Sequence, residues 1–416
     1  MDKTRVEQAR TALRTIFPET PLQLNEYLSR RYGAEIWLKR EDLSPVRSYK
    51  IRGAFNFLRK AIAAGASDRT FVCASAGNHA QGFAFACRHF EVPGVVFMPV
   101  TTPQQKIDKT RTFGGEFITI KLTGDIFDQC YAAARTHVEE TGAVMVPPFD
   151  DADIIEGQAT VAAEMMDQLP DGTMPDLVIM PVGGGGLAAG ITGYLADVMG
   201  PSRFLFTEPV GAPSLKRSLE AGHGVTLSGV DNFVDGAAVA RIGTANFEAL
   251  KTFPASQVML IPENAICVTM TEMLNVEGVV LEPAGGLSVT ALQFLGPEKL
   301  AGKRIVCVVS GGNFDFERLP DVKERAMRYA GLKKYFILRL PQRPGALKDF
   351  LNLLGPEDDI ARFEYLKKTA RNFGSILIGI ETAGPDNFAR LLERFDAAGL
   401  GYQDITENDI LANLII

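Results

Sequence analysis

Short apolar runs alternate with longer segments of helical periodicity through the first three quarters of the chain. The runs are rich in β-branched and aromatic residues, which favour extended strands. Strands that alternate with helices form parallel sheets covered on both faces, so the pattern predicts an α/β fold. The predicted strands are Phe71–Ala74, Val95–Met98, Leu177–Met180, Arg203–Phe206 and Ile305–Val309.

Glycine- or serine-rich segments directly follow three of the predicted strands, at 75–77, 183–186 and 310–312. In open parallel sheets ligands bind beyond the carboxyl ends of the strands, where the N-termini of the following helices also point. We therefore expect the three segments to converge on one ligand site.

The pattern changes after residue 316. A charged, helix-prone segment at 319–332 predicts a connector between a larger domain, 1–318, and a smaller one, 333–416. The smaller domain has predicted strands at 335–340, 360–366 and 376–381, helices at 347–354 and 385–398, and a last short extended piece. This βαββαβ order predicts a ferredoxin-like arrangement, for which about 85 residues suffice.

Composition limits the class of protein. The chain has 416 residues, 46% of them hydrophobic, which is enough for more than one core. Its net charge of -7 is modest and its 43 Lys and Arg are dispersed, so small molecules are expected as partners and nucleic acid is not. With no secretory signal and no apolar run that could span a bilayer, we expect a cytoplasmic protein without membrane association.

The cysteines and histidines predict neither a disulfide frame nor a metal site. The five cysteines are odd in number, widely spaced and mostly set in apolar runs, which indicates reduced, buried thiols. No Cys-x-x-Cys or His-Glu-x-x-His spacing occurs, and the four histidines lie far apart.

Lys50 is the candidate for covalent chemistry. A lysine that condenses with an aldehyde must lose its proton, and neighbouring cations and partial desolvation lower its pKa. Arg47 and Arg52 flank Lys50 and favour this. Taken alone, however, Lys50 fits a solvated surface charge better, in a helix from 49 to 60 that Ser48 caps, because lysines at helix starts are common.

Gly183, Gly184, Gly185 and Gly186 precede a predicted helix that begins near Leu187. Their N–H groups would suit a phosphate, helped by the helix dipole, although a plain tight turn has the same sequence. A second functional interpretation is nicotinamide binding, because Gly183-x-Gly185-x-x-Ala188 fits the dinucleotide pattern and Glu208 ends the next strand. The position of the loop deep in the chain and the presence of Lys50 favour the first.

The segment from Ser75 to His79 places a hydroxyl, an amide and small residues at a strand-to-helix turn. Its N–H groups would grip a carboxylate, and Asn78 would donate to a ring oxygen. Ser75 or Asn78 is also a plausible helix cap. His79 has no acid nearby in the sequence, so a structural role is expected more than a catalytic one.

Ser310 follows the last predicted strand, where it is either a helix cap or the partner of a pyridine nitrogen. A neutral hydroxyl would not keep such a nitrogen protonated, and the ring would be a weaker electron sink. That favours expulsion of a β-leaving group over exchange of amino groups.

Four segments in this order, 48–54, 75–82, 181–187 and 310–313, resemble the motifs of the tryptophan-synthase-β-like (fold type II) pyridoxal-phosphate enzymes. Within that family the chain is most similar to the biosynthetic threonine dehydratases, or threonine ammonia-lyases, over about residues 5–316. The tail from Lys333 resembles the ACT-like regulatory domain of the same enzymes and is present once. The resemblance implies a two-lobed catalytic domain, with a smaller lobe at about 45–150, followed by an α+β regulatory domain.

The resemblance also implies a role for each candidate residue. Lys50 would form the internal Schiff base with pyridoxal 5'-phosphate and then move the α-proton. Glu282 and the loop 234–237 would lie close to the ring, without a firm role. Asn78 would contact the phenolic oxygen of the cofactor, and Ser310 would contact its pyridine nitrogen. The phosphate would be bound by Gly183, Gly184, Gly185, Gly186 and Leu187. The substrate carboxylate would be bound by Ser75, Gly77, Asn78 and His79.

The implied reaction converts L-threonine to 2-oxobutanoate and ammonia, the first step of isoleucine biosynthesis, with serine as a poorer substrate. Isoleucine would inhibit, opposed by valine, and the chain would form a homo-oligomer, a tetramer or a dimer. Some relatives bind a divalent cation through two acids six residues apart. Glu208 matches the first acid, but Ser214 replaces the second, so no metal is expected.

Three alternatives remain open. The first is a serine or threonine racemase, or a serine-preferring dehydratase, of the same fold, for which an end-product sensor has less use. The second is a nicotinamide-dependent oxidoreductase. The third is an amino-acid sensor without catalysis, which the joint presence of Lys50, Asn78 and Ser310 disfavours.

Overall fold

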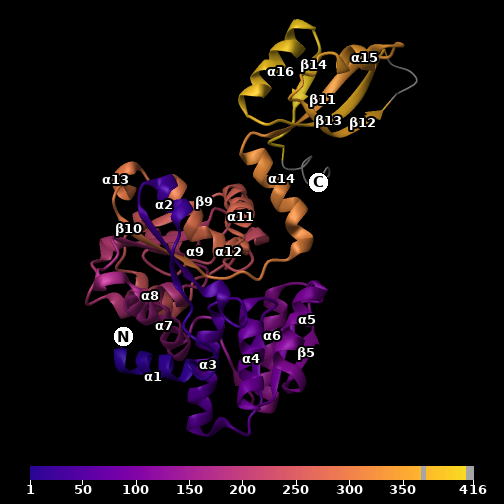
Figure 1. Cartoon of the computed structure of the whole chain (residues 1–416). Coiled ribbons are helices and arrows are strands. Elements are labelled where there is room, and N and C mark those ends of the chain that lie inside the picture. The colour runs from indigo at the N-terminus through magenta and orange to yellow at the C-terminus, as the bar shows by residue number, and fades with distance from the viewer. Residues whose placement is uncertain (367–371, 409–416) are drawn as a thin grey trace. The chain divides into compact units, whose positions relative to one another are not determined.

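The computed structural model describes residues 1–366 and 372–408, which form two compact units, Met1–Asp315 and Phe316 onward (Figure 1). Among these residues, no helix is both long and apolar enough to cross a membrane. All five cysteines are buried and free. The domain boundaries predicted at 318 and 332 stay a prediction.

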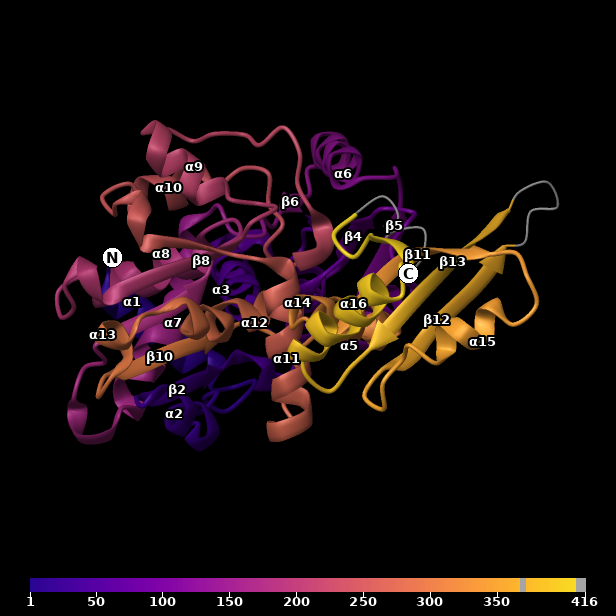
Figure 2. The same ribbon diagram turned by 90° about the horizontal axis from the view of Figure 1, so that it is seen from above.

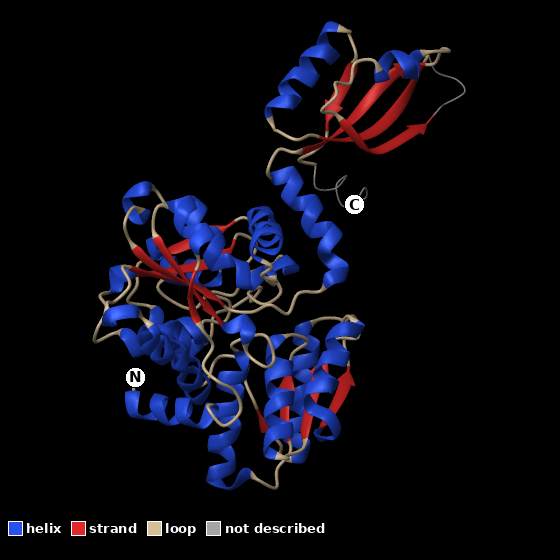
Figure 3. Ribbon diagram, in the orientation of Figure 1, coloured by secondary structure: helices blue, strands red, loops and turns tan. Residues whose placement is uncertain are grey.

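The larger sheet of the first unit has six strands in the order β1-β2-β10-β7-β8-β9. Figure 3 draws the strands in red and the helices around them in blue. Its neighbours run parallel, as predicted, except for β1, which pairs antiparallel with β2. The three strands predicted here from the sequence are confirmed. The bounds are β1 (Leu22–Leu24), β2 (Glu35–Arg40), β7 (Leu177–Pro181), β8 (Phe204–Pro209), β9 (Val258–Ile261) and β10 (Arg304–Val309).

Helices cover both faces of this sheet. Val178 and Met180 of β7 share a core with helices α7 (Ala152–Gln168), α8 (Gly186–Leu195) and α10 (Thr244–Leu250). On the opposite face α12 (Pro283–Thr290) packs against β7, β8 and β10. Because both faces are buried, the strands are continuously apolar instead of alternating.

The smaller sheet has four parallel strands in the order β5-β4-β3-β6. Val72 and Phe97 share a core with α6 (Phe127–Thr141), whereas Cys73 and Val96 share one with α4 (Asn78–Phe90). Alternate residues thus face helices on opposite sides, as the strand pleat requires. The bounds are β3 (Phe71–Ala74), β4 (Gly94–Met98), β5 (Ile118–Leu122) and β6 (Val144–Met145).

Helix α3 (Lys50–Ala61) lies between α4 and α7, and glycines allow both close approaches. A Cβ on Gly82 of α4 would lie 2.9 Å from the Ile51 nitrogen, and one on Gly157 of α7 would lie 2.5 Å from the Arg52 oxygen. The other helices of this unit are α1 (Lys3–Leu13), α2 (Glu26–Tyr32), α5 (Gln104–Gly114), α9 (Ser214–Ala221), α11 (Glu263–Glu277) and α13 (Pro297–Leu300).

The second unit begins with helix α14 (Leu319–Tyr329) and continues as an antiparallel sheet in the order β12-β13-β11-β14. Figure 2 shows its strands β11, β12 and β13. This is the predicted ferredoxin-like arrangement. One core joins Phe336 of β11 and Ile378 of β13 to Phe350 of α15 and Phe395 of α16, so both helices cover one face. The bounds are β11 (Lys333–Pro341), α15 (Ala346–Leu351), β12 (Asp359–Leu366), β13 (Phe373–Glu381), α16 (Asp386–Ala397) and β14 (Gly401–Asp404).

Candidate active site

Lys50 is the first residue of α3, and its side chain is only partly exposed. Its Nζ donates a hydrogen bond of 2.9 Å to the Pro148 carbonyl and lies 5.7 Å from the centre of the Phe149 ring. Burial lowers the pKa of Lys50 from 10.5 to about 8, although the Glu282 carboxylate opposes this shift. Desolvation rather than flanking cations therefore makes the amine available in its neutral form.

The loop that leads to Lys50 is held against the segment after β10. The Tyr49 N–H donates to the Ser310 carbonyl at 3.1 Å, and the Gly312 N–H donates to the Arg47 carbonyl at 2.9 Å. Arg47 has φ 58°, which is uncommon for a residue other than glycine. The sequence motifs around Lys50 and Ser310 are therefore neighbours.

The glycine loop requires glycine for steric and for conformational reasons. A Cβ on Gly184 would lie 2.2 Å from the Phe149 ring, and one on Gly183 would lie 2.9 Å from the Ala237 Cα. Gly185 has φ 93°, which other residues rarely adopt. Phe149 thus touches both the glycine loop and the surroundings of Lys50.

The backbone N–H groups from Gly183 to Leu187 donate no hydrogen bond to any residue in the described part of the chain. They open helix α8, whose dipole places partial positive charge at the same point. Successive N–H donors at a helix N-terminus form an anion site, and the geometry fits the expected phosphate.

Asn78, the first residue of α4, is fixed at both ends of its amide. Its Nδ2 donates to Glu282 Oε1 at 2.7 Å, and its Oδ1 accepts from Asn313 Nδ2 at 2.7 Å. Glu282 is buried, and burial followed by the charge of Asp235 raises its pKa to about 7. One Nδ2 proton of Asn78 remains for a ligand, which fits the expected contact with a ring oxygen.

Ser75, Gly77 and His79 occupy the turn between β3 and α4. The Gly77 N–H donates to Ser75 Oγ at 3.2 Å, and a Cβ on Gly77 would meet no protein atom within 4 Å. His79 is buried, and its Nε2 bonds the Val146 carbonyl at 3.0 Å. Burial and then the charge of Lys50 lower the pKa of His79 to about 3, so the ring is neutral and structural.

Ser310 is buried, and its hydroxyl has no hydrogen-bond partner among residues 1–366 and 372–408. Its carbonyl accepts from Tyr49, which fixes the backbone on which the hydroxyl is carried. A hydroxyl that is free to donate or accept fits the expected contact with a pyridine nitrogen.

The structure corrects the interpretations of Ser48, Ser75 and Asn78 as helix caps. Tyr49 is the N-cap of α3 and Gly77 that of α4, and no side chain caps either helix. Ser48 Oγ is instead buried without a hydrogen-bond partner. The cap interpretation of Ser310 is also wrong, because no helix begins directly after it.

Glu208 caps helix α9. Its carboxylate accepts from the N–H groups of Leu215 at 2.7 Å and Lys216 at 2.9 Å, and from Ser214 Oγ at 3.4 Å. Glu208 is fully buried as well as engaged in these bonds, so its carboxylate is not open to a ribose and does not support the nicotinamide interpretation. The absence of a metal stays a prediction.

Several residues that support the site carry no signal in the sequence. Asn246 Nδ2 donates to the Gly184 carbonyl at 2.7 Å and to the Phe149 carbonyl at 3.1 Å. Asp150 accepts from the N–H groups of Thr244 and Ala245 at 2.8 Å each. Their roles depend on segments that lie about a hundred residues apart, so spacing could not indicate them.

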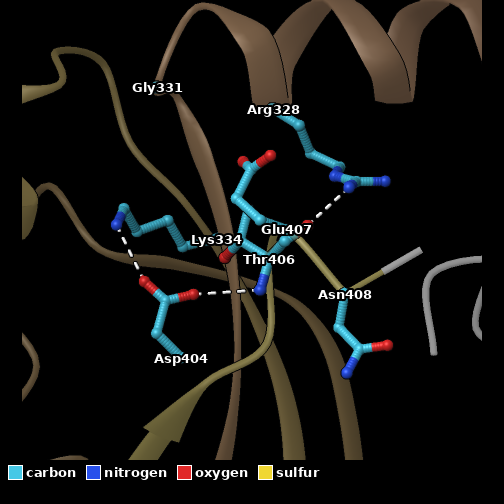
Figure 4. Close-up of a pocket in the computed structure, with 7 residues that line it drawn as sticks. All are labelled: Arg328, Gly331, Lys334, Asp404, Thr406, Glu407 and Asn408. Atoms are coloured by element: carbon cyan, nitrogen blue, oxygen red, sulfur yellow. Dashed lines mark hydrogen bonds and ion pairs between the residues drawn. The ribbon is translucent and has the colours of Figure 1, made fainter. Parts of the chain in front are cut away.

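The second unit has a pocket of about 520 Å³ near the end of α14 (Figure 4). Lys334 Nζ pairs with Asp404 at 2.8 Å, and Arg328 donates to the Thr406 carbonyl. The lining carries both signs of charge, which suits a small zwitterion. It consists of Arg328, Gly331, Lys334, Asp404, Thr406, Glu407 and Asn408.

Comparison with known proteins places both units. A family model described as pyridoxal-phosphate dependent enzyme matches residues 13–311, and one described as the C-terminal regulatory domain of threonine dehydratase matches residues 324–415. The chain is 42% identical over 420 residues to a biosynthetic L-threonine dehydratase of Halalkalibacterium halodurans, with 100% of each chain covered.

Two further proteins support this. The chain is 44% identical over 410 residues to a biosynthetic L-threonine dehydratase of Bacillus subtilis, covering 98% of this chain and 96% of the relative. The solved structure of processed threonine deaminase isoform 2 from Solanum lycopersicum matches with a TM-score of 0.70 and 35% identity, covering 78% of this chain and 94% of that one.

The substitution Gly184→Ala should raise the dissociation constant for pyridoxal phosphate at least about ten-fold, because the added methyl overlaps the Phe149 ring and displaces the loop. An absorbance titration of the cofactor-free protein measures this. Gly200→Ala is the matched control, because its Cβ meets nothing within 4 Å. Equal affinities in wild type and Gly184→Ala, with both folded by circular dichroism, would contradict the assignment of the loop.

Cofactor capture by Lys50 should be pH dependent. With a pKa of about 8, the rate should rise about ten-fold per pH unit below pH 8 and level off above it, because only the neutral amine attacks. Stopped-flow absorbance checks this. In Glu282→Gln the inflection should move to lower pH, since the charge that favours the Lys50 ammonium is lost. A rate that keeps rising to pH 10 would show an ordinary lysine.

Proposed function

The chain belongs to the pyridoxal-phosphate-dependent enzymes and, among them, to the threonine dehydratases, and on this premise we propose the following roles for its residues. The enzyme removes water from L-threonine and releases 2-oxobutanoate and ammonia. The observation that carries the assignment of Lys50 is its convergence with the glycine loop and Ser310, all three joined by the contacts of Tyr49 and Phe149.

Pyridoxal 5'-phosphate is held by the residues that the geometry fits to its parts. The N–H groups of Gly183 to Leu187 would bind the phosphate. Asn78 Nδ2 would donate to the phenolic oxygen, and the Ser310 hydroxyl would contact the pyridine nitrogen. When bound, the cofactor supplies an aldehyde for the amino group and a ring that accepts the electrons freed at Cα.

Lys50 Nζ moves the proton of the substrate. Once its amine is neutral, Nζ takes the proton from Cα of threonine and returns it to the Cβ hydroxyl, which leaves as water. The enamine product takes up one water on hydrolysis, so threonine yields 2-oxobutanoate and ammonia without a net change in water. The neutral Ser310 partner favours this elimination.

The turn before α4 binds the substrate carboxylate. The N–H groups of Asn78 and His79 open the helix, Ser75 offers a hydroxyl, and Gly77 leaves open space for the ligand. His79 contributes through its backbone, because its ring is neutral and bound to Val146. Its ring therefore takes no part in acid–base chemistry.

The second unit senses the end product. Its family match supports a regulatory role, and its pocket has room and charges of both signs for an amino acid. Isoleucine is the inhibitor and valine its antagonist in this proposal. The same unit favours a dehydratase over a racemase. The enzyme works as a homo-oligomer, a tetramer or a dimer, in the cytoplasm.

The purified full-length protein should form 2-oxobutanoate from L-threonine and pyruvate more slowly from L-serine. Lys50→Ala should lower turnover by about a thousand-fold or more and lose the visible absorbance of bound cofactor, because the proton-moving amine is gone. Lys60→Ala, on the same helix, is the control. A Lys50→Ala protein that kept both absorbance and turnover would overturn the proposal.

Isoleucine at millimolar concentration should lower the initial rate of 2-oxobutanoate formation at subsaturating L-threonine, and added valine should restore it. The physical reason is that isoleucine would bind a less active state of the enzyme more tightly than the active state, and so shift the population toward the less active one. L-Alanine is the control effector. An unchanged rate with isoleucine, in a preparation that turns threonine over, would contradict the regulatory part alone.

A further inference from the structure

A fully buried cluster of charges lies beside the Lys50 helix, with Arg52 of α3 at its centre. Arg52 Nε and Nη2 donate to the two carboxylate oxygens of Glu41 at 2.7 and 2.9 Å. Nη1 and Nη2 donate to the two oxygens of Glu164 at 2.8 and 2.7 Å. All three side chains have no solvent exposure. The guanidinium thus binds two carboxylates, each by two hydrogen bonds.

Other buried groups complete the cluster. Lys39 Nζ donates to Glu164 Oε2 at 2.8 Å, and Thr20 Oγ1 donates to Glu41 Oε1 at 2.6 Å. Arg52 also donates to Thr160 Oγ1 at 3.0 Å. Arg14, which is partly exposed, also donates to Glu164. The two carboxylates therefore face two buried cations, Arg52 and Lys39, and a third cation nearer the surface.

Each carboxylate belongs to a segment that places Lys50. Glu41 begins the 3-10 turn Glu41–Leu43, from which the chain runs to Lys50. Glu164 lies on α7, and the bend between β6 and α7 contains Pro148, whose carbonyl accepts from Lys50 Nζ. Arg52 itself lies on the first turn of α3, two residues after Lys50. One guanidinium therefore joins the helix, the incoming loop and the α7 side of the site.

Stability alone does not explain the cluster, because buried ion pairs often stabilise no more than apolar side chains of the same volume. A planar guanidinium that binds two carboxylates fixes both distance and direction. We propose that Arg52 is a positioning residue. It fixes the rotation of α3 and its position along the helix axis, so that Lys50 Nζ reaches the Cα atom of the substrate threonine. This rests on the proposed role of Lys50.

The test compares Arg52→Lys with Lys39→Met, which removes a cation from the same cluster but not from α3. Arg52→Lys should still bind pyridoxal phosphate covalently, whereas kcat for threonine should fall about 10- to 100-fold with KM within about two-fold. The pH inflection of cofactor capture should also move. Lys39→Met should melt at a lower temperature but keep its kcat within about two-fold and its pH inflection in place.

A structural role alone predicts a different outcome. If Arg52→Lys lowers the melting temperature but leaves kcat and the pH inflection at wild-type values, or if both variants lose kcat equally, the proposal is wrong. If Arg52→Lys does not fold, Thr160→Val decides, because it removes only one acceptor of Arg52. A shifted inflection and a smaller fall in kcat support the proposal, and an unchanged protein overturns it. Absent cofactor linkage in the wild type would refute the role of Lys50 instead.

Discussion

The site depends on removing water from one amine. Lys50 Nζ has the Pro148 carbonyl as its polar partner and aromatic rings of Tyr49 and Phe149 nearby. Desolvation disfavours the ammonium form, and the resulting pKa of about 8 leaves enough neutral amine to react. The same burial keeps His79 neutral and raises the pKa of Glu282. One environment thus sets the protonation of three groups.

Such burial requires close approach of backbones, and glycine permits it. Gly82 and Gly157 let α4 and α7 contact α3 from two sides, while Gly184 lets Phe149 lie over the loop that binds the phosphate. The phosphate loop and Lys50 therefore share a wall. Arg52 on α3 forms buried ion pairs with Glu41 and Glu164. These pairs fix the orientation of α3 more narrowly than apolar packing alone would.

The sequence predicted the elements whose signal is local. The apolar strands, the glycine loop and the βαββαβ order of the second unit follow from patterns within a few residues. The antiparallel β1 is only three residues long and offers no such pattern. The predicted cap roles of Ser48, Ser75 and Asn78 were wrong, because none of these side chains accepts a hydrogen bond from the first turn of its helix. The tertiary structure directs them elsewhere. Asn246 and Glu164 act across distances of about a hundred residues, which spacing does not reveal.

The proposed mechanism requires that Lys50, and no other lysine, carries the cofactor. Borohydride reduction of the protein loaded with pyridoxal phosphate, followed by proteolysis and mass spectrometry, locates the modified lysine directly. We expect the added mass of the reduced cofactor on the peptide that contains Lys50, with stoichiometry near one per chain. Modification at another lysine, or none at saturating cofactor, would contradict it.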